Sequence, residues 1–243
     1  MPEAVLEARG VTAGYVPDLP ILHEVSLVAH PAQITLIIGP NGAGKSTLIK
    51  AIAGLLPVSA GQITFGGADI THIRTDQLAA RGIAYVPQTD NIFRSLTIRQ
   101  NLDLALRRAG AGAPARLARL LEQFPALADK QRDKAGTLSG GQRQFLAIAM
   151  ALATAPKLIL MDEPSAGLSP KAAQEVLEHA RTLTRSGVSI LLVEQNVNQA
   201  LRLADHCFIL AEGRNQIDGP ADALLNNKVV GEIYLGARRM GAA

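Results

Sequence analysis

A phosphate-binding loop is the first candidate for chemistry in this sequence. Its pattern is Gly, four residues, then Gly-Lys-Ser/Thr, and its residues are Gly39, Pro40, Asn41, Gly42, Ala43, Gly44, Lys45, Ser46 and Thr47. Because the glycines carry no side chains, the loop can curl so that backbone N–H groups face inward and form a nest for phosphates. The Lys45 ammonium is placed to reach the outer phosphates. The Ser46 hydroxyl is placed to ligate a cation that prefers oxygen, for which we expect Mg2+.

Such a loop functions only where a strand turns into a helix. Residues 34–38 form a short, nearly unbroken apolar run, which is typical of a parallel strand buried on both faces. After the loop, Leu48, Ile49 and Ile52 recur at helical spacing. We therefore expect the positive N-terminal end of a new helix to add to the phosphate nest. A glycine-rich turn that binds nothing would not need this context.

Two carboxylates follow a second apolar run, at residues 157–161. Asp162 and Glu163 would stand at the C-terminal end of a strand, where open α/β sheets bind ligands. We expect Asp162 in the Mg2+ shell, directly or through water, and Glu163 as the acceptor of a proton from the water that attacks the γ-phosphate. Paired acids also occur as solvated strand ends, but the phosphate loop in the same chain favours a functional role.

A second anion site is predicted at the start of another helix, around residues 138–142. Ser139 is suited to cap this helix, and Gly140 and Gly141 expose backbone N–H groups ahead of Gln142. Taken alone, the stretch could also be no more than a capped helix. Two phosphate sites and one acid pair in a single chain leave open where the second site acts.

Composition limits the class of protein. The chain has 243 residues, enough for one large domain or a core with an inserted subdomain, and its net charge is only +3. This mild charge, 3% aromatic residues and the lack of Trp argue against a nucleic-acid partner. The single cysteine, Cys207, is expected to be a buried thiol in a reducing compartment. No apolar run suggests a membrane span or a signal peptide, so we expect a cytoplasmic protein unless something holds it at a membrane.

Strand and helix signals alternate along the chain, which predicts an α/β fold with a mostly parallel sheet. Short strands separated by turns fill residues 4–35, and a long helical segment interrupts the pattern. The expected elements after residue 53 are strands at 61–65 and 83–86 around a helix at 76–80, helices over 97–153 with a loop at 110–114, strands at 158–161 and 189–193, a helix capped by Ser169, a hairpin over 208–217, and helices at 221–225 and 228–235.

These motifs, in this order, resemble those of the ATP-binding-cassette (ABC) ATPases over essentially the whole chain. Residues 39–47 are similar to the family's Walker A motif, 138–142 to its signature, and 158–162 followed by Glu163 to its Walker B motif. The resemblance implies ATP and Mg2+ as cofactors and a P-loop NTPase core with an N-terminal antiparallel β subdomain and an inserted helical subdomain. The expected division is a nucleotide-binding core at 1–88 and 154–243 and a helical subdomain at 89–153.

In that family two cassettes pack head to tail, so that the signature of one closes over the ATP held by the other. By the same resemblance, Gln88 matches the Q-loop glutamine that touches Mg2+ and links to the transmembrane subunit. Tyr15 matches an aromatic residue that stacks on adenine, whereas from spacing alone we would favour simple packing in a strand. The helical subdomain is expected to contact the coupling helices of the membrane partner near residues 92–98, whose apolar members can also be core.

Two positions depart from the family pattern. The switch histidine is replaced by Gln195, which can hydrogen-bond a γ-phosphate but has no charge to change near neutral pH. Hydrolysis is therefore expected to be slower, or to use Glu163 without the usual helper. The aspartate of the D-loop is replaced by Ser169, which weakens the case for a carboxylate contact across the dimer.

Residues 163–170, 193–201 and 233–236 resemble one of the two ATPase subunits of branched-chain amino acid importers. The implied partners are a second, different ATPase subunit, two transmembrane permease subunits and, indirectly, a periplasmic solute-binding protein. The chain would then lie at the cytoplasmic face of the membrane. Alternatives are an importer of urea or short amides, a soluble cassette ATPase acting on nucleic acid or ribosomes, and a nucleotide sensor that scarcely hydrolyses ATP.

Overall fold

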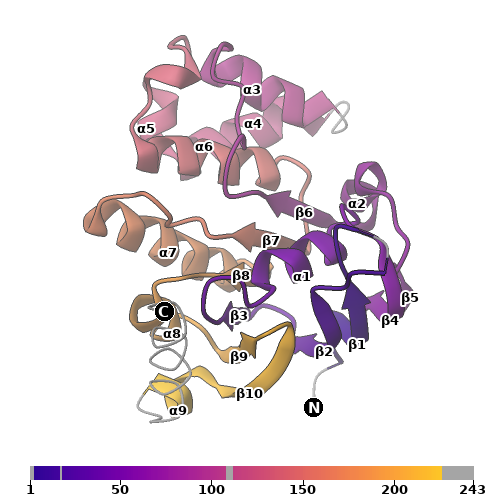
Figure 1. Cartoon of the computed structure of the whole chain (residues 1–243). Coiled ribbons are helices and arrows are strands. Elements are labelled where there is room, and N and C mark those ends of the chain that lie inside the picture. The colour runs from indigo at the N-terminus through magenta and orange to yellow at the C-terminus, as the bar shows by residue number, and fades with distance from the viewer. Residues whose placement is uncertain (1–2, 17, 108–111, 226–243) are drawn as a thin grey trace.

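The large sheet of the protein carries five parallel strands and one antiparallel edge strand. The computed structural model describes residues 3–16, 18–107 and 112–225 (Figure 1). In spatial order the strands are β10 (Arg214–Pro220), β9 (His206–Ala211), β3 (Ile34–Ile38), β8 (Ser189–Val193), β7 (Leu158–Asp162) and β6 (Ile83–Val86). Only β10 runs antiparallel to its neighbour. Strands β3, β7 and β8 are buried along their whole length, as expected of parallel strands covered on both faces.

A second, antiparallel sheet flanks the first, with strands that come before and after β3 in the chain. Its strands are β2 (Leu22–Ala29), β1 (Leu6–Ala13), β4 (Val58–Phe65) and β5 (Ala68–Asp69), in that spatial order. Buried positions alternate with more exposed ones in β2, so this sheet covers the core with one face. The expected N-terminal antiparallel sheet is therefore confirmed, although β4 begins three residues earlier than the strand predicted at 61–65.

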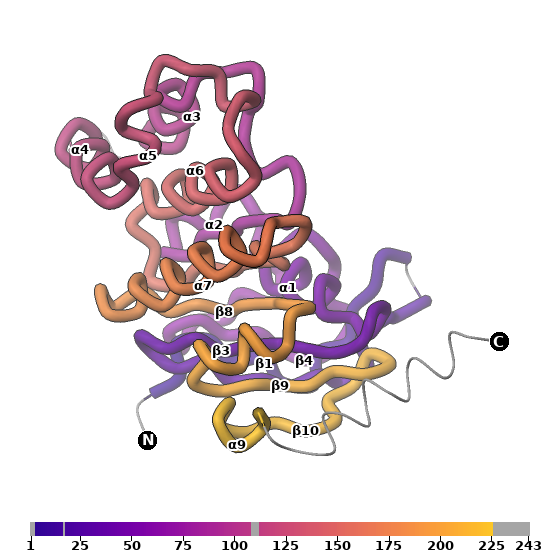
Figure 2. The backbone as a smooth tube through the Cα atoms, turned by 90° about the vertical axis from the view of Figure 1, so that its left-hand side faces the viewer, coloured from indigo at the N-terminus to yellow at the C-terminus, as the bar shows by residue number. Residues whose placement is uncertain are grey.

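The helices lie on both sides of the large sheet and beyond it (Figures 1 and 2). Those packed near the sheets are α1 (Lys45–Ile52), α2 (Thr75–Arg81), α7 (Pro170–Arg185), α8 (Val197–Leu201) and α9 (Ala221–Leu225). Between β6 and β7 the chain forms α3 (Ile98–Ala105), α4 (Ala113–Gln123), α5 (Pro125–Ala128), a 3-10 turn (Ala135–Thr137) and α6 (Gly140–Leu152), a layer stacked beyond α7. None of the described helices is long and apolar enough to cross a bilayer.

The predicted end of the loop at 110–114 was wrong, since α4 already begins at Ala113, with Pro114 in its first turn. Proline suits this place because the first N–H groups of a helix have no partner within it. The helix expected at 228–235 and the motif at 233–236 lie outside the described residues.

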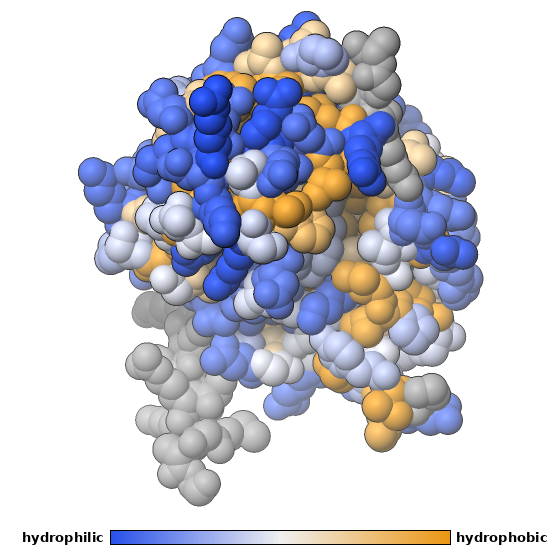
Figure 3. Space-filling view, turned by 90° about the horizontal axis from the view of Figure 1, so that it is seen from above, coloured by the Kyte–Doolittle hydropathy of each residue, from blue (hydrophilic) through white to orange (hydrophobic). Residues whose placement is uncertain are grey.

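The large sheet separates two apolar clusters. On one face, side chains of β3 such as Leu36 pack with α6 and α7, and on the other Ile37 packs with α1 and the antiparallel sheet. Cys207 on β9 is buried in the first cluster, and burial raises its pKa to about 12. The expectation of a buried thiol is confirmed. Seen from the helical end, hydrophilic side chains cover most of the surface, with apolar side chains gathered between them (Figure 3).

The hairpin of β9 and β10 supports the phosphate loop. A Cβ atom at Gly39 would overlap the carbonyl oxygen of Leu210, so the loop lies against the end of β9. In the turn of the hairpin, the N–H of Gly213 donates to the carbonyl of Ala43 at 3.1 Å, and the N–H of His23 donates to the carbonyl of Gly213 at 2.8 Å. The turn thus joins the phosphate loop to β2, and it confirms the hairpin predicted over 208–217.

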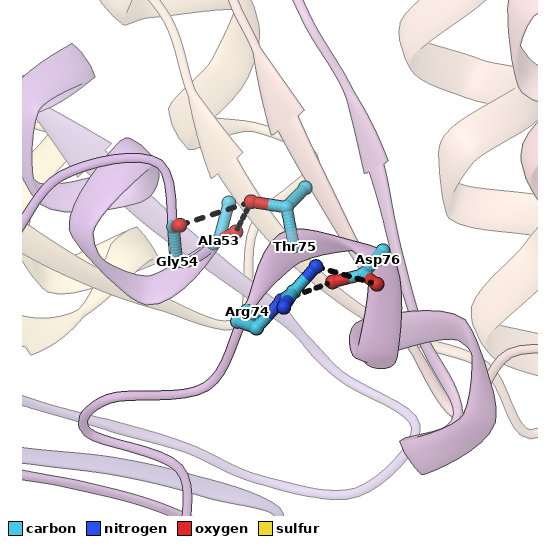
Figure 4. Close-up of polar contacts among 5 residues, drawn as sticks. All are labelled: Ala53, Gly54, Arg74, Thr75 and Asp76. Carbon is cyan, nitrogen blue, oxygen red and sulfur yellow. Dashed lines mark hydrogen bonds and ion pairs between the residues drawn. The ribbon is translucent and has the colours of Figure 1, made fainter.

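The C-terminal end of α1 is held by the first residue of α2 (Figure 4). The hydroxyl of Thr75 donates to the carbonyls of Ala53 and Gly54, at 2.9 Å each. Beside it, the exposed side chains of Arg74 and Asp76 pair at 3.0 Å, a contact that contributes little stability in water. The helix that starts with Lys45 is therefore fixed at its C-terminal end as well as at the phosphate loop.

The hairpin turn gives a test of this support. We expect Gly213→Ala to destabilise the protein more than Gly187→Ala. Both glycines have positive φ, 70° and 87°. A side chain on this left-handed backbone should lower the free energy of unfolding of either variant by about 1–2 kcal/mol. A Cβ atom at Gly213 would also overlap the carbonyl oxygen of Ile21, whereas none meets an atom at Gly187. Overpacking should lower the free energy of unfolding of Gly213→Ala by a further amount of about 1–3 kcal/mol. Denaturant unfolding of both variants measures the difference. Equal losses would contradict a rigid turn.

Candidate active site

The phosphate loop lies between β3 and α1, as its pattern requires. Gly42 and Gly44 have φ values of 81° and 96°, which only glycine adopts without strain, and Gly44 caps α1. Residues 41–47 line a cavity of about 320 Å³ together with Ile21, Glu163 and Gln195. The loop therefore faces Glu163 and Gln195, which follow the C-terminal ends of two other strands.

Lys45 is buried although it is charged, with only 5% of its surface exposed. Its Nζ donates to the carbonyls of Gly39 at 2.9 Å and Pro40 at 3.1 Å, so the ammonium spans the loop. Burial lowers the pKa of Lys45, and the negative charges of Glu163 and Asp162 oppose this shift. The side chain is thus held over the cavity in a place suited to attract phosphate oxygens.

Ser46 and Asp162 form an oxygen pair beside the loop. The Oγ of Ser46 donates to Oδ1 of Asp162 at 3.0 Å. Burial raises the pKa of Asp162, and the hydrogen bond from Ser46 opposes this effect. The pair fits Mg2+, which binds a few protein oxygens and fills its shell with phosphate oxygens and water. No cluster of three or more His, Cys, Asp or Glu able to hold a metal occurs within the described part of the chain.

Glu163 is the centre of a small hydrogen-bond network. Its Oε2 accepts from Nε2 of Gln88 at 2.9 Å and from Nε2 of Gln195 at 2.7 Å. The three residues follow β6, β7 and β8, which are adjacent in the sheet, so three neighbouring strand ends deliver them. The backbone of Glu163 has φ 49°, unusual for a residue with a side chain, and its N–H donates to Val193 at 2.9 Å. The structure thus brings together the three predicted catalytic residues.

The signature residues stand apart from this cavity. Ser139 caps α6: its Oγ accepts from the N–H of Gln142 at 3.3 Å, and the side-chain oxygen of Gln142 accepts from the N–H of Ser139 at 3.2 Å. This reciprocal capping box satisfies two backbone donors at the start of the helix. Gly140 lines a different cavity, of about 200 Å³, and neither it nor Gly141 lines the phosphate-loop cavity. In a single chain the two predicted phosphate sites remain separate.

Tyr15 is not part of the core. Its side chain is 51% exposed, and Nζ of Lys50 lies 5.5 Å from its ring centroid. The simple packing favoured by spacing alone is therefore wrong, and adenine stacking stays a prediction. In the stretch at 92–98 the apolar residues divide, because Ile92 and Ile98 are buried whereas Phe93 is 55% exposed.

Sequence reasoning gave no role to Glu194, although the structure places it directly behind the site. Its carboxylate is buried and accepts hydrogen bonds from the backbone N–H and the hydroxyl of Ser165. One signal was present in the sequence: Glu194 directly follows the apolar strand 189–193, as Glu163 follows the strand ending at Asp162. The same argument about strand ends would have selected it.

Comparison with known proteins shows one family. The family model described as ABC transporter matches residues 22–166. The chain is 39% identical over 223 residues to the high-affinity branched-chain amino acid transport ATP-binding protein BraG of Pseudomonas aeruginosa, covering 91% of this chain and 96% of that protein. It is 40% identical to the probable branched-chain amino acid transport ATP-binding protein LivF of Archaeoglobus fulgidus, covering 96% and 99%.

More distant relatives extend the comparison. The lipopolysaccharide export system ATP-binding protein LptB of Escherichia coli K12 is 34% identical, with 96% and 98% covered. Among solved structures, an ATP-binding cassette of an ABC transporter in its ADP conformation superposes with a TM-score of 0.84 at 30% identity, covering 96% of this chain and 99% of the other. A dimeric cassette in a post-hydrolysis state bound to ADP and Pi superposes with a TM-score of 0.77 at 26% identity, covering 89% and 98%.

The network around Glu163 predicts the effect of removing its charge. In Glu163→Gln we expect kcat for ATP hydrolysis to fall by about 10²–10⁴-fold, because an amide cannot accept the proton of the attacking water. Nucleotide affinity should persist, because the phosphate loop is unchanged. Turnover and nucleotide binding measured on the same preparation check this. Glu175→Gln, an exposed site on α7, is the matched control. Normal turnover in Glu163→Gln would exclude Glu163 as the base.

The amide of Gln195 gives a separate prediction. In Gln195→Ala we expect kcat to fall on the order of 10²-fold, as when one preorganised hydrogen-bond donor is lost, with little change in KM for ATP. Steady-state kinetics across a range of ATP concentrations measures both constants. Asn198→Ala, an exposed residue of α8, should behave as wild type. An unchanged kcat in Gln195→Ala would show that hydrolysis does not use this amide.

Proposed function

The chain belongs to the ABC transporter family of ATPases, and from this premise we propose that it is an ATP-hydrolysing subunit of an importer for branched-chain amino acids. The observation that carries the proposal is the position of Glu163 between the amides of Gln88 and Gln195, at the cavity lined by the phosphate loop. The solute class is supported by 39% and 40% identity to two branched-chain amino acid transport proteins, against 34% to a lipopolysaccharide export protein.

ATP would bind with its phosphates in the loop of residues 39–47 and its adenine on Tyr15. Lys45 would hold the outer phosphates with its ammonium. Ser46, Asp162 and the amide oxygen of Gln88 would hold Mg2+, since this cation prefers oxygen ligands. Bound there, Mg2+ would neutralise charge on the phosphate oxygens.

Hydrolysis would proceed through Glu163. Its carboxylate takes a proton from a water molecule whose oxygen attacks the γ-phosphorus, while the bond to the bridging oxygen breaks and ADP and phosphate leave. The amides of Gln88 and Gln195 hold one carboxylate oxygen, Oε2, which orients the other toward the water. Gln195 supplies an N–H where the family has histidine, so its role would not change with pH near neutrality.

A second cassette would complete the site. The signature turn at 139–142 does not line the phosphate-loop cavity of its own chain, so we place it over the ATP of a neighbour. The similarity to a cassette whose structure is dimeric supports this arrangement. We expect the neighbour to be a different ATPase subunit, because the sequence resembles only one of the two in such importers.

Permease subunits would dock beside the helical layer. A groove of about 320 Å³ runs between α2, β6 and α6, lined largely by apolar side chains that include Leu78, Tyr85 and Met150. It lies between the proposed nucleotide-binding core, 1–88 and 154–243, and the proposed helical subdomain, 89–153. A permease segment in this groove would hold the chain at the cytoplasmic face of the membrane and couple it indirectly to a periplasmic solute-binding protein.

Reconstituted transport tests this function. The chain, co-purified with its permeases and companion ATPase, should drive ATP-dependent uptake of leucine into vesicles. Ala79→Arg, in the groove, should abolish uptake and co-purification while the isolated chain keeps its nucleotide binding, because a charged side chain would fill the docking site. Ala118→Arg, at an exposed position of α4, is the matched control.

The outcomes separate the alternatives. Uptake of urea or a short amide without uptake of leucine would contradict the proposed solute. Co-purification with nucleic acid, with binding that weakens steeply with salt, would contradict a transport role altogether. ATP binding without turnover in every assembly would instead favour a nucleotide sensor.

A further inference from the structure

A buried carboxylate lies directly behind the proposed reaction centre. Glu194 follows β8 and is 1% exposed. Its Oε1 accepts from the N–H of Ser165 at 3.0 Å, and its Oε2 accepts from the hydroxyl of Ser165 at 2.7 Å and from the N–H of Gln195 at 3.3 Å. Burial raises the pKa of Glu194, and the hydrogen bonds from Ser165 oppose this shift. A carboxylate is tolerated in the interior only when it is hydrogen-bonded in this way.

Ser165 belongs to a tight turn that begins at Glu163. The turn is closed by two backbone bonds, from the N–H of Ala166 to Glu163 at 3.1 Å and from the N–H of Leu168 to Ser165 at 3.2 Å. Residues 161–165 are buried, whereas Ala166 and Gly167 are exposed and Leu168 is half-buried. Glu194 therefore accepts two hydrogen bonds from Ser165, the last buried residue of the turn.

The far end of this turn contacts the signature residues. A Cβ atom at Gly140 would lie 2.8 Å from Cδ2 of Leu168, so the leucine packs against the first turn of α6. One short segment thus reaches from Glu163, in the phosphate-loop cavity, to the signature of the same chain. Its position relative to β8 is set by the bond from the Glu163 N–H to Val193 and by the two bonds from Ser165 to Glu194.

We propose that Glu194 is a positioning residue for ATP hydrolysis, which fixes the 163–168 turn and the backbone of Gln195 in one arrangement. With Ser165 and Gln195 both bonded to one carboxylate, the side chain of Gln195 stays at 2.7 Å from Glu163. The same bonds keep Leu168 against Gly140. The inference rests on the proposed function, because it assigns Glu194 to the hydrolytic step.

A merely structural role for Glu194 predicts a different result. Loss of a buried hydrogen-bonded acid would then lower the melting temperature but leave kcat per folded molecule unchanged. Misplacement of Glu163 and Gln195 relative to the phosphates would instead lower kcat and leave KM for ATP nearly unchanged, since the phosphate loop is not involved. Kinetic constants and melting temperatures measured together separate these two roles.

Four variants form the experiment, assayed in the assembly in which the wild type hydrolyses ATP. In Glu194→Ala we expect kcat to fall by about tenfold to a hundredfold, because small misplacements of catalytic groups cost this much. In Ser165→Ala, which keeps the hydrogen bond from the backbone N–H of residue 165 to Glu194, kcat should fall less. Glu194→Gln should recover part of kcat, because its amide can accept from the Ser165 N–H and donate to the hydroxyl, whereas its nitrogen cannot accept from the N–H of Gln195. Ser189→Ala is the control: it loses a part-buried hydrogen bond of 2.9 Å, which the N–H of Ala32 donates to the Ser189 hydroxyl at the opposite end of β8.

The results decide as follows. Wild-type kcat in Glu194→Ala, or a change confined to KM, would overturn the inference whatever the melting temperature. Should Glu194→Ala not fold, a normal kcat in Ser165→Ala would overturn it instead. An equal loss of kcat in Ser189→Ala would also overturn it, since the effect would then follow from stability. Absence of turnover in the wild type would count against the proposed function, not against the positioning by Glu194.

Discussion

The cost of burying charge is the constraint on which this structure depends. Within the described residues, four charged side chains are buried, Lys45, Asp162, Glu163 and Glu194. All four lie at one edge of the large sheet, where parallel strands end or where β3 leads into the phosphate loop. Each is held by hydrogen bonds, because an unpaired charge in the interior would cost several kcal/mol. The sheet thus gathers at this edge the charged groups whose burial would cost the most free energy without hydrogen-bond partners.

The hydrogen bonds that make this burial possible also fix the geometry of the site. Glu163 accepts two amide N–H groups, and Asp162 accepts a hydroxyl, so neither acid depends on a cation for its position. Amide donors differ from an imidazole in that they carry no charge to gain or lose near neutral pH. With Gln195 in place of histidine, the network around Glu163 keeps the same pattern of donors across the physiological range.

Much of this edge was predictable from local sequence, and some of it was not. The phosphate loop, the acid pair and the cap at Ser139 follow from short patterns, since each depends on residues close together in the chain. The support of the loop by Gly213 depends on contacts between residues about 170 positions apart, which no local pattern records. The strand-end pattern would have selected Glu194, but its hydrogen bonds to Ser165, 29 residues away, follow from no local pattern. For Tyr15, spacing alone favoured packing within a strand, whereas the residue lies beyond the end of β1 and its side chain is exposed.

The arrangement of the signature turn has a consequence for the whole assembly. Gly140 packs on Leu168, a few residues beyond Glu163, yet the signature does not line the phosphate-loop cavity. If the signature turn binds the ATP of a neighbour, as proposed, such a chain would carry two half-sites joined by the segment 163–168. Displacement of that segment at either half-site must be felt at the other, because tight packing does not allow it to deform freely. Two chains arranged head to tail would then have their ATP sites joined through the segments of both, and communication between the sites would need no further machinery.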